Sequence, residues 1–271
     1  NKDGFADSSN THWAAVKSAY QPGLGDTLAD AMKLCGLALG EDLTSTRNSF
    51  LITYNEVSSN LLDNYANAQV AFSLRKLRAA YTGAAIRVQN SGGTQADIGF
   101  DSNGDLDTAS LALHVGSGTG FVVTWYDQSG NGRNATQSTQ SLLPRITISG
   151  TLQTVNGKPA VDFDSHRLDT SAFSPNPNGA YNLAVVSQYD SVTSGQGSAN
   201  SWSSTSTLQN YQHTMMSNSK LRFAVRYSDG ALPRPDSTGT FTANTQIIST
   251  ATFATGTCVA YYNGTQEGDK F

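Results

Sequence analysis

The strongest candidate for an acid pair in this sequence is formed by two aspartates at alternate positions. One residue separates Asp162 from Asp164, so a strand would present both carboxylates on one face. Two carboxylates about 5–9.5 Å apart are what the hydrolysis of a glycosidic bond requires. Aspartates at the end or edge of a strand show the same spacing without catalysis. The three glutamates lie in no paired motif such as Glu-x-Asp-x-Glu, at Glu41, Glu56 and Glu267.

A second group of oxygen-bearing side chains lies between positions 101 and 107. It resembles the beginning of a calcium-binding loop, whose ligands would be Asp101, Asn103, Asp105 and Asp107. That loop needs glycine at its sixth position and glutamate at its twelfth, where this chain has Leu106 and Ala112. The alternative is a β-turn at Asn103-Gly104, followed by a helix at 108–115 that Asp107 caps. Calcium is the one cofactor that this pattern suggests.

The histidines and cysteines indicate no further reactive set. The histidines are dispersed and accompany no nucleophile elbow, at His12, His114, His166 and His213. Cys35 and Cys258 each have apolar neighbours, which favours two buried thiols, with a long-range disulfide as the alternative.

A saccharide-binding platform is predicted in the region rich in Ser and Asn near position 202. A sugar ring needs an aromatic surface beside amide or hydroxyl groups, which Trp202, Asn210 and Tyr211 would supply. The alternative is that Trp202 anchors its loop in the core.

The stretch 121–145 contains a strand followed by a tight turn. Residues 121–126 are β-branched and aromatic, as in a strand, and Gly130-Asn131-Gly132 then accept positive φ. The polar side chains before and in this turn favour stabilisation of the turn over binding of a ligand, at Asp127, Gln128, Asn131 and Arg133.

The sequence WYDQSGNG at 125–132, followed by NATQ at 134–137, resembles the signature of a concanavalin A-like (laminin-G-like) jelly-roll group. The catalytic domain of family 54 fungal α-L-arabinofuranosidases has a similar turn. Domains of bacteriophage tail and virion proteins are similar over a longer segment, with counterparts of 71–78, 81–83, 86–88 and 97–100 before the turn. The resemblance extends from about Asn67 to the C-terminus, and it implies a mainly β, concanavalin A-like two-sheet jelly-roll sandwich. The resemblance to the arabinofuranosidases covers the turn only, so it carries no catalytic residue onto this chain, and one fold hosts many functions.

Two regions are expected from the order of the elements. Residues 1–66 have a short amphipathic helix at 26–39 and a strand-like run at 50–54, but no complete core. We interpret them as an extended and helical attachment arm that docks on other virion proteins or on copies of the chain.

Residues 67–271 are the predicted jelly-roll domain. Asn67 would cap a helix at 68–80, and the apolar run at 181–188 predicts a central strand. Residues 190–206 are predicted to form a long loop, and Asn156-Gly157 a hairpin turn. In the related jelly rolls further strands follow, so we expect a missing C-terminal part or an edge that another chain covers.

Composition limits the partners. The chain of 271 residues is 14% charged, against about 25% in an average protein, and its net charge of −4 argues against nucleic acid. No apolar run is long enough for a membrane span. The leading hypothesis is a bacteriophage virion protein, a tail, fibre or head-decoration subunit, whose jelly roll contacts host-surface polysaccharide. The alternatives are a secreted carbohydrate-active enzyme and a cellular adhesin.

Overall fold

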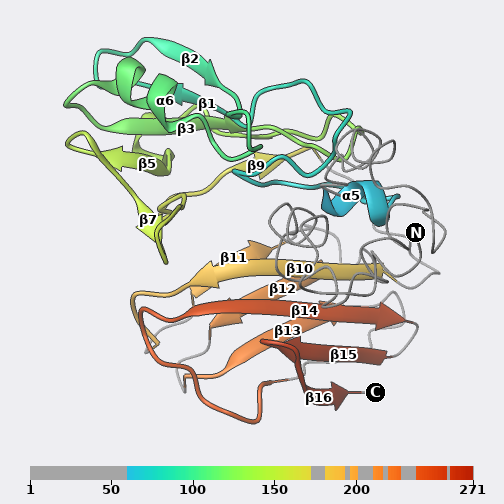
Figure 1. Ribbon diagram of the computed structural model, residues 1–271. Helices are drawn as coiled ribbons and strands as arrows, with labels where there is room; N and C mark the ends of the chain where they lie inside the picture. Colours follow the sequence, from blue (N-terminus) through green and yellow to red (C-terminus); the bar gives the residue numbers. More distant parts are fainter. Residues whose placement is uncertain are drawn as a thin grey trace, which may run out of the picture. The chain divides into compact units, whose positions relative to one another are not determined.

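The computed structural model describes residues 60–171, 181–192, 196–200, 210–215, 219–226, 236–254 and 257–270. Residues Leu61–Phe271 form one compact unit that is mainly β, with several antiparallel sheets (Figure 1). Most of the attachment arm predicted at 1–66, with its helix at 26–39, lies outside the described residues, which begin at Asn60, and the arm stays a prediction. No helix among the described residues is long and apolar enough to cross a membrane.

The first sheet has seven strands and includes the strand of the signature stretch. Its order is β2 (Gln95–Ile98), β1 (Ile86–Gln89), β3 (Gly120–Trp125), β4 (Ala135–Thr136) and β9 (Asp169–Thr170). Beside β4, β3 also pairs with β5 (Arg145–Ile148), which pairs with β6 (Thr151–Leu152). A separate hairpin of β7 (Thr154–Val155) and β8 (Lys158–Pro159) turns at Asn156-Gly157, where both residues have positive φ, as predicted.

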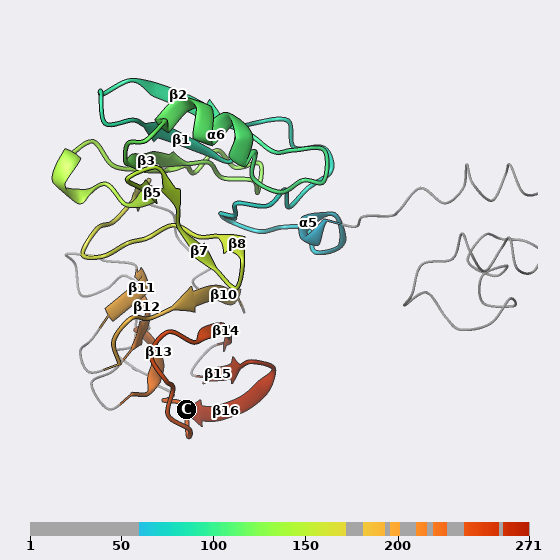
Figure 2. The same ribbon diagram turned by 60° about the vertical axis from the view of Figure 1, so that its left-hand side comes forward.

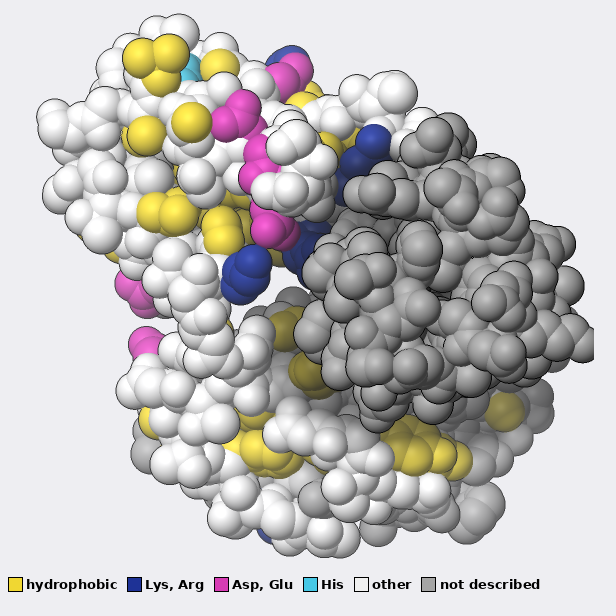
Figure 3. Space-filling view, viewed as in Figure 1, with side chains coloured by type: hydrophobic (Ala, Val, Ile, Leu, Met, Phe, Trp, Pro, Cys, Tyr) yellow, Lys and Arg dark blue, Asp and Glu magenta, His cyan; other side chains and the backbone are white. Residues whose placement is uncertain are grey.

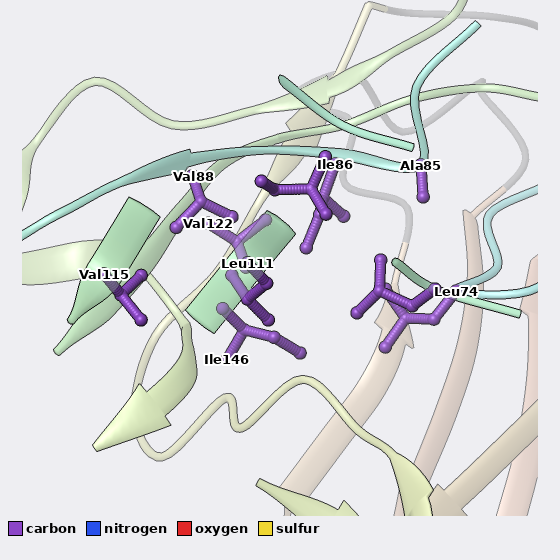
Figure 4. Close-up of a cluster of buried hydrophobic side chains, with 10 residues drawn as sticks. Leu74, Ala85, Ile86, Val88, Leu111, Val115, Val122 and Ile146 are labelled. Atoms are coloured by element: carbon purple, nitrogen blue, oxygen red, sulfur yellow. The ribbon is translucent and has the colours of Figure 1, made fainter. Parts of the chain in front are cut away.

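One face of this sheet is apolar and carries a helix. Ile86 and Val88 of β1 and Val122 of β3 are fully buried, while Arg87 and Gln89 point to the other side. Helix α6 (Thr108–Val115) covers the apolar face, and its Leu111 and Val115 join the same core (Figures 2 and 4). This one-sided alternation is typical of an antiparallel sheet with one solvated face.

The rest of the unit is built from two further sheets. One has the order β10 (Tyr181–Gln188), β14 (Gln246–Ala254), β15 (Thr257–Tyr262) and β16 (Thr265–Lys270). The other has the order β11 (Gln196–Asn200), β12 (Asn210–Met215) and β13 (Leu221–Arg226). Side chains of both sheets share a core, in which the rings of Phe223 and Phe253 meet edge to face at 6.3 Å. A sandwich-like packing of two sheets therefore follows the first sheet in the chain.

Two predictions for this part were wrong. The strand at 181–188 pairs only with β14 among the described residues, so it lies at the end of the described four-stranded sheet and not in its centre. The apolar run suggested a strand buried on both faces, but one face of β10 is exposed, and Val186 on that face is 63% exposed. The predicted loop at 190–206 contains strand β11, which pairs with β12.

Two short helical elements complete the description. Helix α5 (Leu61–Asn64) lies at the start of the unit, and its Leu62 is buried. A single 3₁₀ turn, η1 (Gln140–Leu142), precedes β5.

Candidate functional site

The signature turn uses its polar side chains to hold the chain itself. The carboxylate of Asp127, which is 4% exposed, accepts hydrogen bonds from the backbone N–H groups of Ala71, Ser129 and Arg133 at 2.9–3.0 Å. The Ser129 hydroxyl donates to it at 2.7 Å. An ionised buried carboxylate is tolerated here because four donors replace its water.

Gln128 holds the same neighbouring segment, and the side chains of Asp127 and Gln128 with their hydrogen-bond partners are here called the clamp. Its side chain is fully buried, accepts from the N–H of Leu77 at 2.8 Å, and donates to the carbonyls of Ser73 and Arg75 at 2.9 and 3.0 Å. One side chain thus takes the place of a neighbouring strand for residues 73–77.

The predicted helix at 68–80 was therefore wrong. This segment has no regular secondary structure, and Asn67 has a φ of 72°. Apolar residues do recur at helical spacing, but the backbone groups bond to the distant turn and not to each other. Asn131 and Arg133 also donate to the carbonyl of Gln69, which agrees with the predicted turn-stabilising role.

Replacing Gln128 by alanine tests the clamp. We expect a loss of about 3 kcal/mol in the free energy of unfolding, because three partly buried backbone groups lose their partners at about 1 kcal/mol each, the low end of the usual range. Urea unfolding measures it, with Gln95→Ala, an exposed glutamine of β2, as the matched control. Equal effects of the two substitutions would contradict the proposed role of the buried amide.

The acid stability of the protein tests Asp127. Burial raises the pKa of this carboxyl, but the hydrogen bonds from Ser129, Arg133 and Ala71 outweigh it and hold the pKa below its usual value. A depressed folded-state pKa contributes stability above about pH 4, which is lost as pH falls through the folded value. We expect Asp127→Asn to be less stable than the parent at pH 7, and the difference to shrink towards pH 2. A difference that stays constant in urea unfolding over this range would refute it.

The residues of the suggested calcium loop have other partners. Asp101 accepts from the N–H groups of Asn103 and Asp105, and Asp107 caps α6 through the N–H of Ser110. Asp105 pairs with Arg75 at 2.9 Å and with Lys158 at 3.3 Å, and Figure 3 shows acidic next to basic side chains on the face that it views. No group of three or more His, Cys, Asp or Glu side chains within the described ranges has the geometry of a metal site. The turn and the helix cap are what the structure contains.

The side chains of Asp162 and Asp164 lie close together because both contact the guanidinium of Arg145. Arg145 contacts Asp162 at 2.7 Å and Asp164 at 3.2 Å, and Asp162 also accepts from the N–H of Asp164. Phe163, between them, stacks on Trp125 with ring centroids 6.3 Å apart. The two carboxylates thus share one guanidinium.

The solvent-facing side of the first sheet, here called the outer face, gathers further polar side chains in two rows. Residues in register on neighbouring antiparallel strands lie side by side on one face. The first row is Gln95, Gln89, Phe121, Arg145 and Asp162. The second row is Asp97, Arg87, Thr124, Thr136 and Asp169. Five adjacent chain segments make the outer face about 19 Å wide.

Hydrogen bonds fix the side chains of the outer face. Arg87 donates to both oxygens of Asp97 at 2.8 Å, and the Tyr126 hydroxyl donates to Asp97 at 2.7 Å. The bonds from Arg87 lower the pKa of Asp97, while burial and the bond to Asp97 raise the pKa of Tyr126 to about 12. Gln89 donates to Gln140 at 2.6 Å and accepts from Gln95 at 3.2 Å. The outer face is thus a preorganised set of amide, guanidinium, carboxylate and hydroxyl groups.

The outer face was missed from the sequence. Alternation in Ile86–Gln89 does predict one polar side for that strand. The neighbours across strands depend on register, and a bulge shifts the pairing of β1 with β3 between Arg87 and Val88. Sequence alone gives no sign of that shift.

The predicted saccharide platform lies mainly outside the described residues. Trp202 is not described, and Asn210 and Tyr211 begin β12, where only their backbone is described. Of the histidines, His114 bonds the carbonyl of Val88 at 3.0 Å, a structural role.

Comparison with known proteins gives a fold. No family model and no curated protein matches the sequence. A solved family 54 α-L-arabinofuranosidase soaked with a cyclic sulfate inhibitor has a TM-score of 0.55 at 12% identity, over 78% of this chain and 53% of its own. The chain shares its β-sandwich fold.

Two further solved structures give the same result. A mutant of a family 54 enzyme, soaked with 4-nitrophenyl α-L-arabinofuranoside, has a TM-score of 0.54 at 13% identity, with coverages of 78% and 53%. An arabinofuranosidase complexed with arabinofuranosyl-α-1,2-xylobiose has a TM-score of 0.53 at 13% identity, with coverages of 78% and 52%. The chain spans about half the length of these enzymes, and at such identities the likeness concerns the fold alone.

Proposed function

We propose that the chain is a saccharide-binding β-sandwich that does not cleave its ligand. The observation that carries this proposal is the outer face, where polar groups and an aromatic ring stand in two rows on rigid strands. Polysaccharides present many hydroxyls and apolar ring faces, which such a surface complements. The fold that the chain shares with arabinofuranosidases is compatible with a carbohydrate ligand.

Binding is favoured over hydrolysis by the state of the carboxylates. Each aspartate of the outer face is held by a guanidinium, in the pairs Arg87–Asp97, Arg145–Asp162 and Arg167–Asp169. A catalytic carboxylate must be open to the substrate, whereas the carboxylates of these pairs already bond a guanidinium. The fold similarity keeps a glycoside hydrolase as the second candidate.

For its location we propose the surface of a bacteriophage virion, as a tail, fibre or head-decoration subunit. The support is the resemblance of segments 71–100 and 125–137 to virion domains, together with the low charge content. Residues 1–66 would dock on other virion proteins or on copies of the chain. The ligand would be polysaccharide of the host surface, with Trp202, Asn210 and Tyr211 as a second contact region.

A glycan array tests the proposed function. We expect the intact chain to bind polysaccharide, and Thr136→Arg, which places a long side chain in the second row, to weaken binding at least about tenfold. Leu113→Arg is the matched control, because Leu113 is 88% exposed on α6, at the apolar side of the sheet. Weaker binding by Trp202→Ala would show that the second contact region, at Trp202, Asn210 and Tyr211, also binds the polysaccharide.

The same samples decide between binding and hydrolysis. The chain should release nothing from aryl glycosides. Turnover that disappears in Asp162→Asn or Asp164→Asn would favour the hydrolase, and the absence of binding to every glycan would refute the proposal.

Assembly tests the proposed location. We expect light scattering and negative-stain microscopy of the full chain to show oligomers, since a virion subunit is present in repeated copies. A chain that stays strictly monomeric at high concentration would argue against the virion and for a secreted protein.

A further inference from the structure

One residue of the outer face breaks its polar pattern. Phe121 is only partly buried and lies between Gln89 on β1 and Arg145 on β5. Its strand neighbours Gly120 and Val122 are fully buried on the other side, so the alternation places Phe121 on the solvated side. Within the described residues its ring meets no other aromatic ring, unlike those of Phe72, Trp125 and Phe163. Phe121 is also not among the side chains that pack against the apolar core beneath the sheet. A local break of the polar pattern outside the core is where function is expected.

The neighbours of Phe121 keep hydrogen-bonding capacity. Arg145 uses Nε and Nη2 toward the carboxylates, and its Nη1 has no partner among the described residues. The amide nitrogen of Gln89 donates to Gln140 with one of its two hydrogens. An apolar ring is thus flanked by a free guanidinium donor and an amide donor.

The charge of the outer face indicates which sugars fit. With Arg167 and Asp164, which pair with Asp169 and Arg145 of the two rows, the outer face has three arginines, at 87, 145 and 167, and four aspartates, at 97, 162, 164 and 169. The net charge of these seven side chains is −1, and each arginine already pairs with a carboxylate. A uronic acid would find no cation excess here, whereas hydroxyls find both donors and acceptors.

We propose that Phe121 is the stacking platform for a neutral sugar ring, with Gln89 and Arg145 bonding its hydroxyls. Stacking uses the apolar face of the ring, and the two flanking strands set the direction of the saccharide across the sheet. This proposal rests on the proposed function and names the site and the ligand class within it.

Titration calorimetry of the full chain tests the site. The neutral probes are arabinan, galactan and dextran, and the acidic probe is polygalacturonate. Phe121→Thr, which keeps strand propensity, should lower the affinity for the tightest-binding neutral probe at least about tenfold, and Gln89→Ala should lower it about threefold. The control is Phe163→Ala, because Phe163 is 39% exposed but its ring stacks on Trp125, which belongs to neither row of the outer face. Its binding should match that of the parent.

Each outcome decides. If the parent binds neutral probes and both variants bind like it, or if Phe163→Ala weakens binding as much as Phe121→Thr, the platform is elsewhere, while saccharide binding stands. Preference for polygalacturonate overturns the ligand class. Binding to none of the four overturns this proposal, and an empty glycan array in addition overturns the proposed function. Should Phe121→Thr unfold, as thermal melting would show, Gln89→Ala decides alone, since it changes only a side chain on the surface.

Discussion

The buried hydrogen bonds of Asp127 and Gln128 are the constraint on which the first sheet depends. Strand β3 ends two residues before Asp127, so the clamp fixes the end of the strand from which Phe121 and Thr124 project. It also fixes residues 68–77, whose Leu74 contributes to the core beneath the sheet. Removing these two side chains would leave partly buried N–H and C=O groups without partners, which costs more than the bonds themselves contribute.

The polar outer face follows from the apolar one. Because Ile86, Val88 and Val122 must be buried under α6, the residues between them are forced toward water. The chemistry of the outer face is therefore supported by a packed core on rigid strands, which lowers the entropic cost of holding several polar groups for one ligand. A surface of this kind suits binding along an extended polymer.

The sequence predicted what local physics determines. The mainly β class, the Asn156-Gly157 hairpin and the Asp107 cap all depend on neighbouring residues, and the structure contains all three. The helix at 68–80 failed because its backbone partners lie more than fifty positions away in Asp127 and Gln128. Asp162 and Asp164 were found by spacing, but their shared Arg145 was not, since the bridge between Arg145 and Asp162 is a tertiary contact.

The side chains of the turn bond almost only main-chain atoms of the neighbouring segment. Their contacts on residues 68–77 are N–H and carbonyl groups, with the Gln69 side-chain oxygen as an added partner of Arg133. Such recognition is indifferent to which side chains the segment carries. The outward side chains of this segment, such as Arg75 with its exposed ion pair, can therefore change without changing the path of the backbone. The turn fixes the position of the segment, and the segment can present different side chains at the surface.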